Sequence, residues 1–207
     1  YELARTMCSI SVEVHLGLSE EQEQQLFYDL NNLTKRVEAG LAYSYDYTNP
    51  VNQFIKDHLV EASFFKPSIQ DRDLKDWSVD DGRITRKDLI AINSILFLNK
   101  TNSKAAKQTS VKQKIDFGNK FWEQINTIPY FGEEGCKSKS IIGQPVTIKA
   151  LAKIAYDLGY NTKNKNEEAL TKLFRQMKSI DFGHNNQVWQ YYNLDDKIRR
   201  DKFQGLE

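Results

Sequence analysis

Histidine and carboxylate side chains are the first candidates for catalysis in this chain, which has only three histidines, His15, His58 and His184. His184 follows Asp181 in the segment Asp181-Phe182-Gly183-His184-Asn185-Asn186, and an aspartate three residues earlier could orient its imidazole. Asp and Asn in such polar turns more often bind backbone groups, so a structural turn is the alternative. No nucleophile, base and orienting residue occur together, and we expect no catalytic residues and no enzyme activity.

Motifs that bind nucleotides or metal ions are missing from the sequence, so neither a cofactor nor a metal is expected. There is no Walker loop, dinucleotide fingerprint or His-Glu-x-x-His motif. Asp80-Asp81-Gly82-Arg83 is typical of a tight turn and is too short for a calcium loop. Cys8 and Cys136 stand far apart, which fits neither a zinc site nor a disulfide framework and favours a reducing cytoplasm.

Basic residues offer a different chemistry, the attraction of a phosphate backbone. The first 32 residues carry a net charge of −5, so the remaining 175 carry +6. One cluster begins a predicted helix, where backbone N–H groups also attract phosphate, and a pair follows the Asn31-Asn32 helix end. A lysine-rich stretch comes later, and a solvated helix face is its alternative interpretation. The residues predicted to bind double-stranded DNA are Arg83, Arg86 and Lys87, then Lys35 and Arg36, then Lys104, Lys107, Lys112 and Lys114.

Alternation and helical periodicity predict the elements that would position these side chains. Residues 10–16 alternate as a half-buried strand, and Ser19 with Gln22 forms a capping box for a helix whose apolar face begins at Leu26. Further helices are predicted from Asn49-Pro50, from Thr85, across 111–125, from Thr147 to Gly159, and from Asn166 to Met177. Residues 130–146 hold glycines and a proline and are predicted to be a mobile loop.

The predicted fold is mainly α, with a small β element near the N-terminus (α+β overall). Sub-lobes at 1–129 and 147–207, joined by the loop that contains glycine and proline, are a further expectation. No apolar run approaches the roughly 18 residues of a membrane helix, so no membrane association is expected. The helices at 147–178 faintly resemble a helix-turn-helix, although their turn is longer than usual and most helix pairs of this kind are simple αα-hairpins. Trp189, Tyr191 and Tyr192 either stack on bases or close a core.

Three stretches together resemble the DndB family of DNA sulfur modification proteins, whose members carry the DGQHR motif. They are Leu26-Phe27-Tyr28-Asp29-Leu30-Asn31-Asn32 with Tyr45-Asp46 and Asn49-Pro50, residues 147–158, and Ile180-Asp181-Phe182-Gly183-His184-Asn185-Asn186 with Trp189. The residues that mark the family in them are Phe27, Asp29, Asn31, Asp46, Pro50, Asp181, His184, Asn185 and Trp189.

The signature Asp-Gly-Gln-His/Thr-Arg segment of that family does not occur in this chain. Asp81-Gly82-Arg83 matches it superficially but lies downstream of the Leu26 stretch that should follow it. We therefore expect residues 1–207 to be the helix-rich C-terminal part of a DndB-like protein, beginning just after the signature.

The resemblance implies a role in DNA phosphorothioation, a backbone modification used in defence against phage and other foreign DNA. It suggests a non-enzymatic regulator, a repressor that binds promoter DNA. One alternative is the accessory half of a ParB-like nucleotide-dependent enzyme. Another is a protein-interaction scaffold for DNA modification proteins, with Trp77, Trp122 or Trp189 facing a partner. A homo-oligomer is a further possible assembly.

Overall fold

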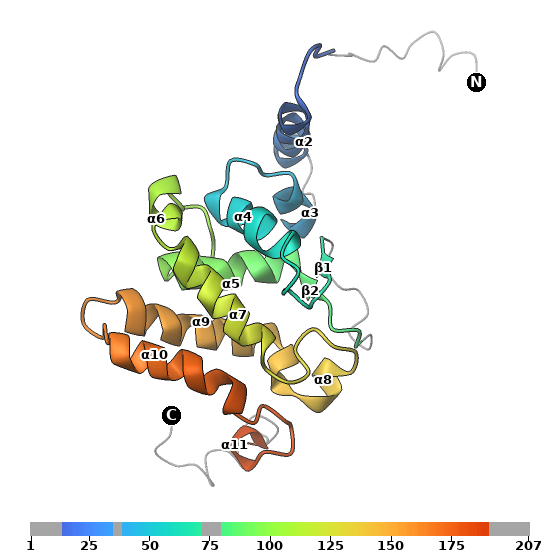
Figure 1. Ribbon diagram of the computed structural model, residues 1–207. Coiled ribbons are helices and arrows are strands. Elements are labelled where there is room, and N and C mark those ends of the chain that lie inside the picture. The colour runs from blue at the N-terminus through green and yellow to red at the C-terminus, as the bar shows by residue number, and fades with distance from the viewer. Residues whose placement is uncertain (1–13, 35–38, 72–79, 191–207) are drawn as a thin grey trace.

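The computed structural model describes residues 14–34, 39–71 and 80–190 (Figure 1). Its helices are α2 (Glu20–Thr34), α3 (Ala39–Ser44), α4 (Pro50–Ile55), α5 (Arg86–Leu98), α6 (Gln108–Lys112), α7 (Ile115–Asn126), α8 (Cys136–Lys139), α9 (Pro145–Tyr160), α10 (Glu167–Gln176) and α11 (Gln187–Gln190). Short helical turns are η1 (Lys56–Val60), η2 (Ile141–Gly143) and η3 (Met177–Ser179), and the strands are β1 (Ile69–Gln70) and β2 (Ile84–Thr85).

Helix α5 is the centre of the fold and packs against α9 along much of its length, with α3, α4 and α7 also against it. The Thr85 side chain accepts from the Asp88 N–H to begin it, and Asn99, in the left-handed region at φ 54°, ends it. Leu89, Ile92 and Leu96 are fully buried, as expected for the inner stripe of a core helix.

The mainly helical prediction is confirmed, and a small β element is present. It is a parallel pair in which Ile69 faces Ile84 and Gln70 faces Thr85. The strand predicted at 10–16 lies largely outside the described residues, and its described end, 14–16, is not a strand.

Two helix predictions need correction. The helix predicted across 111–125 is broken into α6 and α7, because the backbone at Lys114 leaves the helical region (φ −120°, ψ 9°). The helix predicted from Thr147 begins earlier, at Pro145, whose fixed φ suits the first helical turn. Gly159 lies inside that helix instead of ending it, and a Cβ added to it would lie 3.5 Å from the Leu170 side chain and the Phe117 ring.

The prediction that residues 130–146 form an irregular loop is wrong, and the predicted mobility of the segment stays a prediction. The segment contains α8 and η2, and Phe131, Cys136 and Ile142 are at most 3% exposed. Asp80 binds its backbone, accepting from the N–H groups of Lys137 and Ser138 at 2.8 Å each. Glycines predicted flexibility here, but in the fold they let backbones approach one another closely.

The apolar face predicted on α2 is also less buried than expected. Its capping box is present, since the Ser19 N–H donates to Gln22 Oε1 at 2.9 Å. Phe27 and Leu30, however, are 44% and 52% exposed, and the Phe27 ring has Tyr45 as its aromatic neighbour at 4.7 Å. Helix α2 lies at the edge of the molecule, beside α3 (Figure 1).

One hydrophobic cluster runs through the described residues and takes side chains from both predicted sub-lobes. Val51, Leu89 and Trp122 belong to it, as do Ile148 and Ala155 of α9. A division into sub-lobes stays a prediction.

Candidate nucleic-acid interface

The first basic cluster, at the start of α5, is paired with carboxylates. Arg83 forms an ion pair with Asp81 across the tight turn, and the hydrogen bond from Arg83 lowers the pKa of that carboxyl despite some burial. Lys87, one residue inside α5, is exposed. Gly82 closes the turn at φ 73°, so the Asp-Gly-Arg sequence here is a structural turn, as predicted.

Within this cluster, Arg86 is the residue least accessible to a phosphate, because it is only 7% exposed. Its Nε donates to Asp71 Oδ1 at 2.6 Å and its Nη1 to Asn52 Oδ1 at 3.3 Å. Asn52 in turn donates to the Asp46 carbonyl at 2.7 Å. The guanidinium therefore joins the start of α5 to α4 and to the residue that follows β1, and its donors are used inside the fold.

A buried polar corner shapes the loop that carries the lysine-rich stretch. Asp46 is 5% exposed and accepts from the N–H groups of Thr48 and Asn49 at 3.0 and 3.1 Å. The Asn49 side chain caps α4 by accepting from the Val51 and Asn52 N–H groups, and its Nδ2 donates to Ser103 Oγ at 2.7 Å. Ser103 is 3% exposed and immediately precedes Lys104, so this corner fixes where the next lysines stand.

Exposed lysines gather at the other end of α5, in the loop that follows it and on α6. No carboxylate of the described residues forms an ion pair with any of them, and no Asp or Glu occurs between residues 99 and 115. Helix α5 has 13 residues, about 20 Å, so this group is well separated from Arg83 and Arg86. We call it the lysine surface; its members are Lys100, Lys104, Lys107 and Lys112.

Lys100 was missing from the sequence prediction because it belongs to a polar turn outside the stretch counted there. Its position is fixed by the end of α5, where its N–H donates to the Ser94 carbonyl at 3.3 Å. That bond and the left-handed Asn99 form a Schellman-type helix end. In the sequence, the signal for this helix end was Asn99, which directly follows the last apolar residue of the helix.

Lys114 is not part of the lysine surface, although it was predicted with it. Its ammonium donates to the Phe97 carbonyl and lies over the Tyr160 ring, 4.4 Å from the centroid. The Tyr156 ring is also near, at 5.1 Å. Burial lowers the pKa of Lys114 below its usual value. The side chain is therefore engaged between α5, α7 and α9.

The segment at 181–189 is held by backbone contacts, which favours the structural interpretation of its histidine. His184 Nε2 lies 2.7 Å from the Lys137 carbonyl, so this ring nitrogen donates. Asp181 Oδ1 accepts from the Gly183 N–H at 2.8 Å, and its carbonyl accepts from Trp189 Nε1 at 2.6 Å. The Trp189 ring stacks on Phe182, with centroids 5.8 Å apart and planes 3° from parallel.

The sequence of this chain matches the family model described as "DndB: DNA-sulfur modification-associated" over residues 3–204, nearly its whole length. The chain belongs to the DndB family. None of the curated proteins and none of the solved structures compared with it matches it. The resemblance expected from the sequence is confirmed, and with it the link to DNA sulfur modification.

The residues that mark the DndB resemblance do not converge on one site. Asp46 and Pro50 form the buried corner beside Lys104, whereas His184 attaches the C-terminal segment to α8, and Asp181 and Trp189 bond to each other within that segment. Asn185 is exposed in that segment. On α2, Asp29 accepts from Gln25 at 3.1 Å and Asn31 lies in the last turn. Lys35, Arg36, Tyr191 and Tyr192 lie outside the described residues.

Trp122 and Trp189, the two tryptophans within the described residues of this DndB-family chain, do not form one partner-facing patch. Trp122 is fully buried and donates to Asn93 Oδ1 at 2.9 Å, and Trp189 is stacked on Phe182. Trp77 lies outside the described residues. Burial removes Trp122 as a partner-facing residue, and the scaffold hypothesis stays a prediction.

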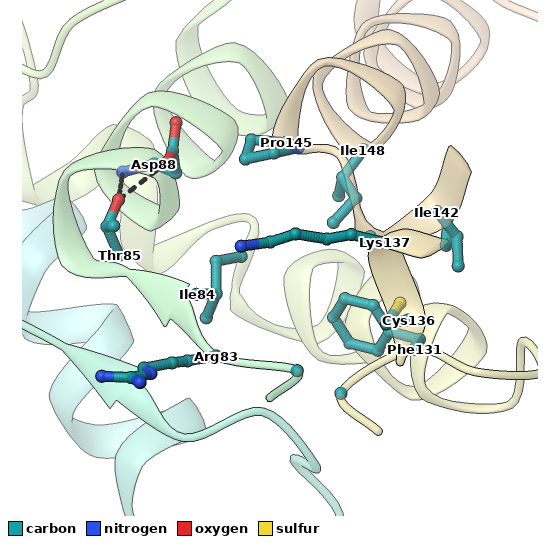
Figure 2. Close-up of a pocket in the computed structure, with 13 residues that line it drawn as sticks. Arg83, Ile84, Thr85, Asp88, Phe131, Cys136, Lys137, Ile142, Pro145 and Ile148 are labelled. Atoms are coloured by element: carbon teal, nitrogen blue, oxygen red, sulfur yellow. Dashed lines mark hydrogen bonds between the residues drawn. The ribbon is translucent and has the colours of Figure 1, made fainter. Parts of the chain in front are cut away.

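A small cavity lies between β2, α8 and the start of α9, and Figure 2 shows the Lys137 side chain lying across it between Ile84 and Ile148. Its volume is about 30 Å³, enough for about two water molecules and too small for a nucleotide. Cys136 lines it, and burial raises the pKa of that thiol to about 11, so it is protonated at neutral pH.

Neither metal binding nor membrane crossing has support in the residues that the structure describes. No group of three or more His, Cys, Asp and Glu side chains there is arranged to hold a metal ion. Among the helices of the same residues, none combines the length and apolar character needed to cross a bilayer.

Proposed function

We propose that this DndB-family chain is a non-enzymatic, DNA-associated regulator of the DNA phosphorothioation system. It acts in the cytoplasm as a repressor that binds promoter DNA of the modification genes. The lysine surface carries the proposal, because it combines exposure, single-sign charge and the absence of ion-pair partners among the described residues. Such a surface attracts a phosphate backbone and releases the counterions condensed on it.

Hydrogen bonds at the backbone beside Lys100 and Lys104 support the same role. Lys104 follows a serine that is buried and hydrogen-bonded to Asn49, and Lys100 is fixed by the end of α5. Fixed backbones lose less conformational freedom on binding than loose ones, which favours affinity. Arg86 contributes to the fold instead, through its bonds to Asp71 and Asn52.

Fluorescence anisotropy with a labelled duplex, measured over a range of salt concentrations, tests this function. In Lys104→Gln/Lys107→Gln/Lys112→Gln the negative slope of log affinity against log salt should become shallower by about 2.7, since each phosphate contact contributes roughly 0.9 to its magnitude. The control is Lys66→Gln/Lys139→Gln/Lys178→Gln, which removes the same charge from exposed lysines elsewhere and should leave the slope unchanged.

The affinities of the protein for promoter DNA and for an unrelated duplex of equal length then test whether it prefers the promoter, as a repressor should. A regulator should bind the promoter more tightly at physiological salt, whereas phosphate contacts alone give equal affinities. If the unsubstituted protein binds no duplex at low salt, the proposal is wrong.

A further inference from the structure

We infer that the turn between α9 and α10, residues 161–166, completes the lysine surface, so that two segments distant in sequence hold one DNA duplex. The inference rests on the proposed function and adds a second contact region to it. The turn has the sequence Asn-Thr-Lys-Asn-Lys-Asn, with Lys163 and Lys165 and no acidic residue. Residues 162–166 are all exposed.

Lys114 brings the two segments together. Its ammonium touches the Phe97 carbonyl in the last turn of α5 and the Tyr160 ring at the end of α9, 4.4 Å from the centroid. The C-terminal ends of the two helices are thus neighbours. Figure 1 shows both ends, with α6, on one side of the molecule (left in the view).

Short chain lengths keep the lysines near this junction. Lys100 follows Phe97 by three residues, and Lys163 follows Tyr160 by three. Three residues span at most about 11 Å, so neither lysine can lie far from the point where Lys114 joins the helices. A duplex carries one charge per roughly 1.7 Å of its axis, so both groups can meet phosphates of one duplex.

The turn is also held in one conformation by its own backbone. The Lys165 N–H donates to the Asn161 carbonyl at 2.7 Å, and the Asn166 N–H donates to the Leu158 carbonyl at 2.8 Å. The Asn166 side chain then caps α10 by accepting from Ala169. Both parts of the proposed interface are therefore formed before DNA arrives, which reduces the entropy cost of binding.

The charges of the turn are available to phosphate. Lys163 forms no ion pair within the described part of the chain. Lys165 lies 3.0 Å from Glu167, but their side chains are 53% and 80% exposed. An ion pair that exposed is weak and screened by salt, so a phosphate can replace the carboxylate.

The test is Lys163→Gln/Lys165→Gln in the anisotropy titration. The salt slope should fall by about 1.8, and affinity at 0.1 M salt should fall roughly tenfold or more for each lysine removed. Lys163→Arg/Lys165→Arg keeps the charge and should keep the slope. Lys66→Gln/Lys139→Gln is the control of equal charge. Circular dichroism melts should show all these variants folded, because the altered side chains are exposed.

Combining the two groups decides whether they hold the same duplex. In Lys104→Gln/Lys107→Gln/Lys163→Gln/Lys165→Gln the salt slope should become shallower by about 3.6. The unsubstituted protein should bind one duplex through both groups of lysines together. An unchanged slope for Lys163→Gln/Lys165→Gln, or a second duplex bound through the turn, overturns the inference. If Lys104→Gln/Lys107→Gln still lowers the slope, the proposed function stands without it.

Discussion

The Lys114 ammonium lies over the Tyr160 ring, 4.4 Å from its centroid, and donates to the Phe97 carbonyl. One lysine thereby fixes the break between α6 and α7 and joins the ends of α5 and α9. A cation over an aromatic face is stabilised by the ring quadrupole, more so when water is partly excluded. The contact explains why this lysine is not exposed with its neighbours in sequence.

Replacing Lys114 with Met should reduce the free energy of unfolding at pH 7 by about 1 kcal/mol. The change keeps the apolar stem but removes the bond to Phe97 and the contact with Tyr160. Urea unfolding measures it. Lys120→Met, at an exposed position of α7, is the control and should have little effect.

The pH dependence of that difference should also change in a defined direction. Burial lowers the pKa of Lys114, so between the lowered pKa and the ordinary value of 10.5 the unfolded chain binds more protons than the folded one. The free energy of unfolding should then rise with pH in that interval, and Lys114→Met should lose this rise. A rise of equal size in both proteins would contradict the assignment.

Arg86→Met should destabilise the fold without altering the salt dependence of DNA binding. It leaves the Asn52 side-chain oxygen buried without its donor and Asp71 without its partner, which costs about 2 kcal/mol. Arg83→Met, which removes an exposed pair, should leave the unfolding midpoint nearly unchanged. A reduced salt slope in folded Arg86→Met would instead place Arg86 on DNA.

Gly82→Ala should destabilise the protein by more than about 2 kcal/mol. Gly82 has φ 73°, and an added Cβ would lie 2.5 Å from the Gly132 carbonyl carbon. Gly17 has the same φ with no atom within 4 Å of that position. Gly17→Ala is therefore the matched control, and thermal melts should separate the two variants. Equal melting temperatures would show that the Gly82–Gly132 approach is unimportant.

Trp189→Phe should cost about 1 kcal/mol, because it keeps the stack on Phe182 but loses the bond to the Asp181 carbonyl. Trp189→Ala also loses the stack and should cost about 2 kcal/mol, since the ring is partly exposed. The denaturant midpoints of the two variants compare their stabilities. DNA affinity, measured at denaturant concentrations where both variants are folded, should be unchanged. Loss of affinity in folded Trp189→Phe would favour base stacking by this ring.

The sequence by itself determined where several helices begin. Ser19 with Gln22, Asn49 with Pro50, and Thr85 with Asp88 all form the predicted caps. A cap involves residues no more than about four positions apart, so the chemistry is complete within the segment. The family resemblance also rested on sequence alone, on three stretches whose order and spacing span nearly the whole chain.

Only the tertiary structure decided which charges face solvent. Arg86 and Lys104 are both basic residues beside a helix end, yet Arg86 is bound by Asp71 and Asn52, and Lys104 is exposed. Lys114 and Tyr160 are 46 residues apart, and their contact follows from the packing of α5 against α9. Burial and distant ion pairs are set by how the helices pack, which the order of residue types along the chain does not specify. For this reason the sequence predicted several basic clusters, and only the fold showed that the lysine surface is the one whose charges are exposed and without ion pairs among the described residues.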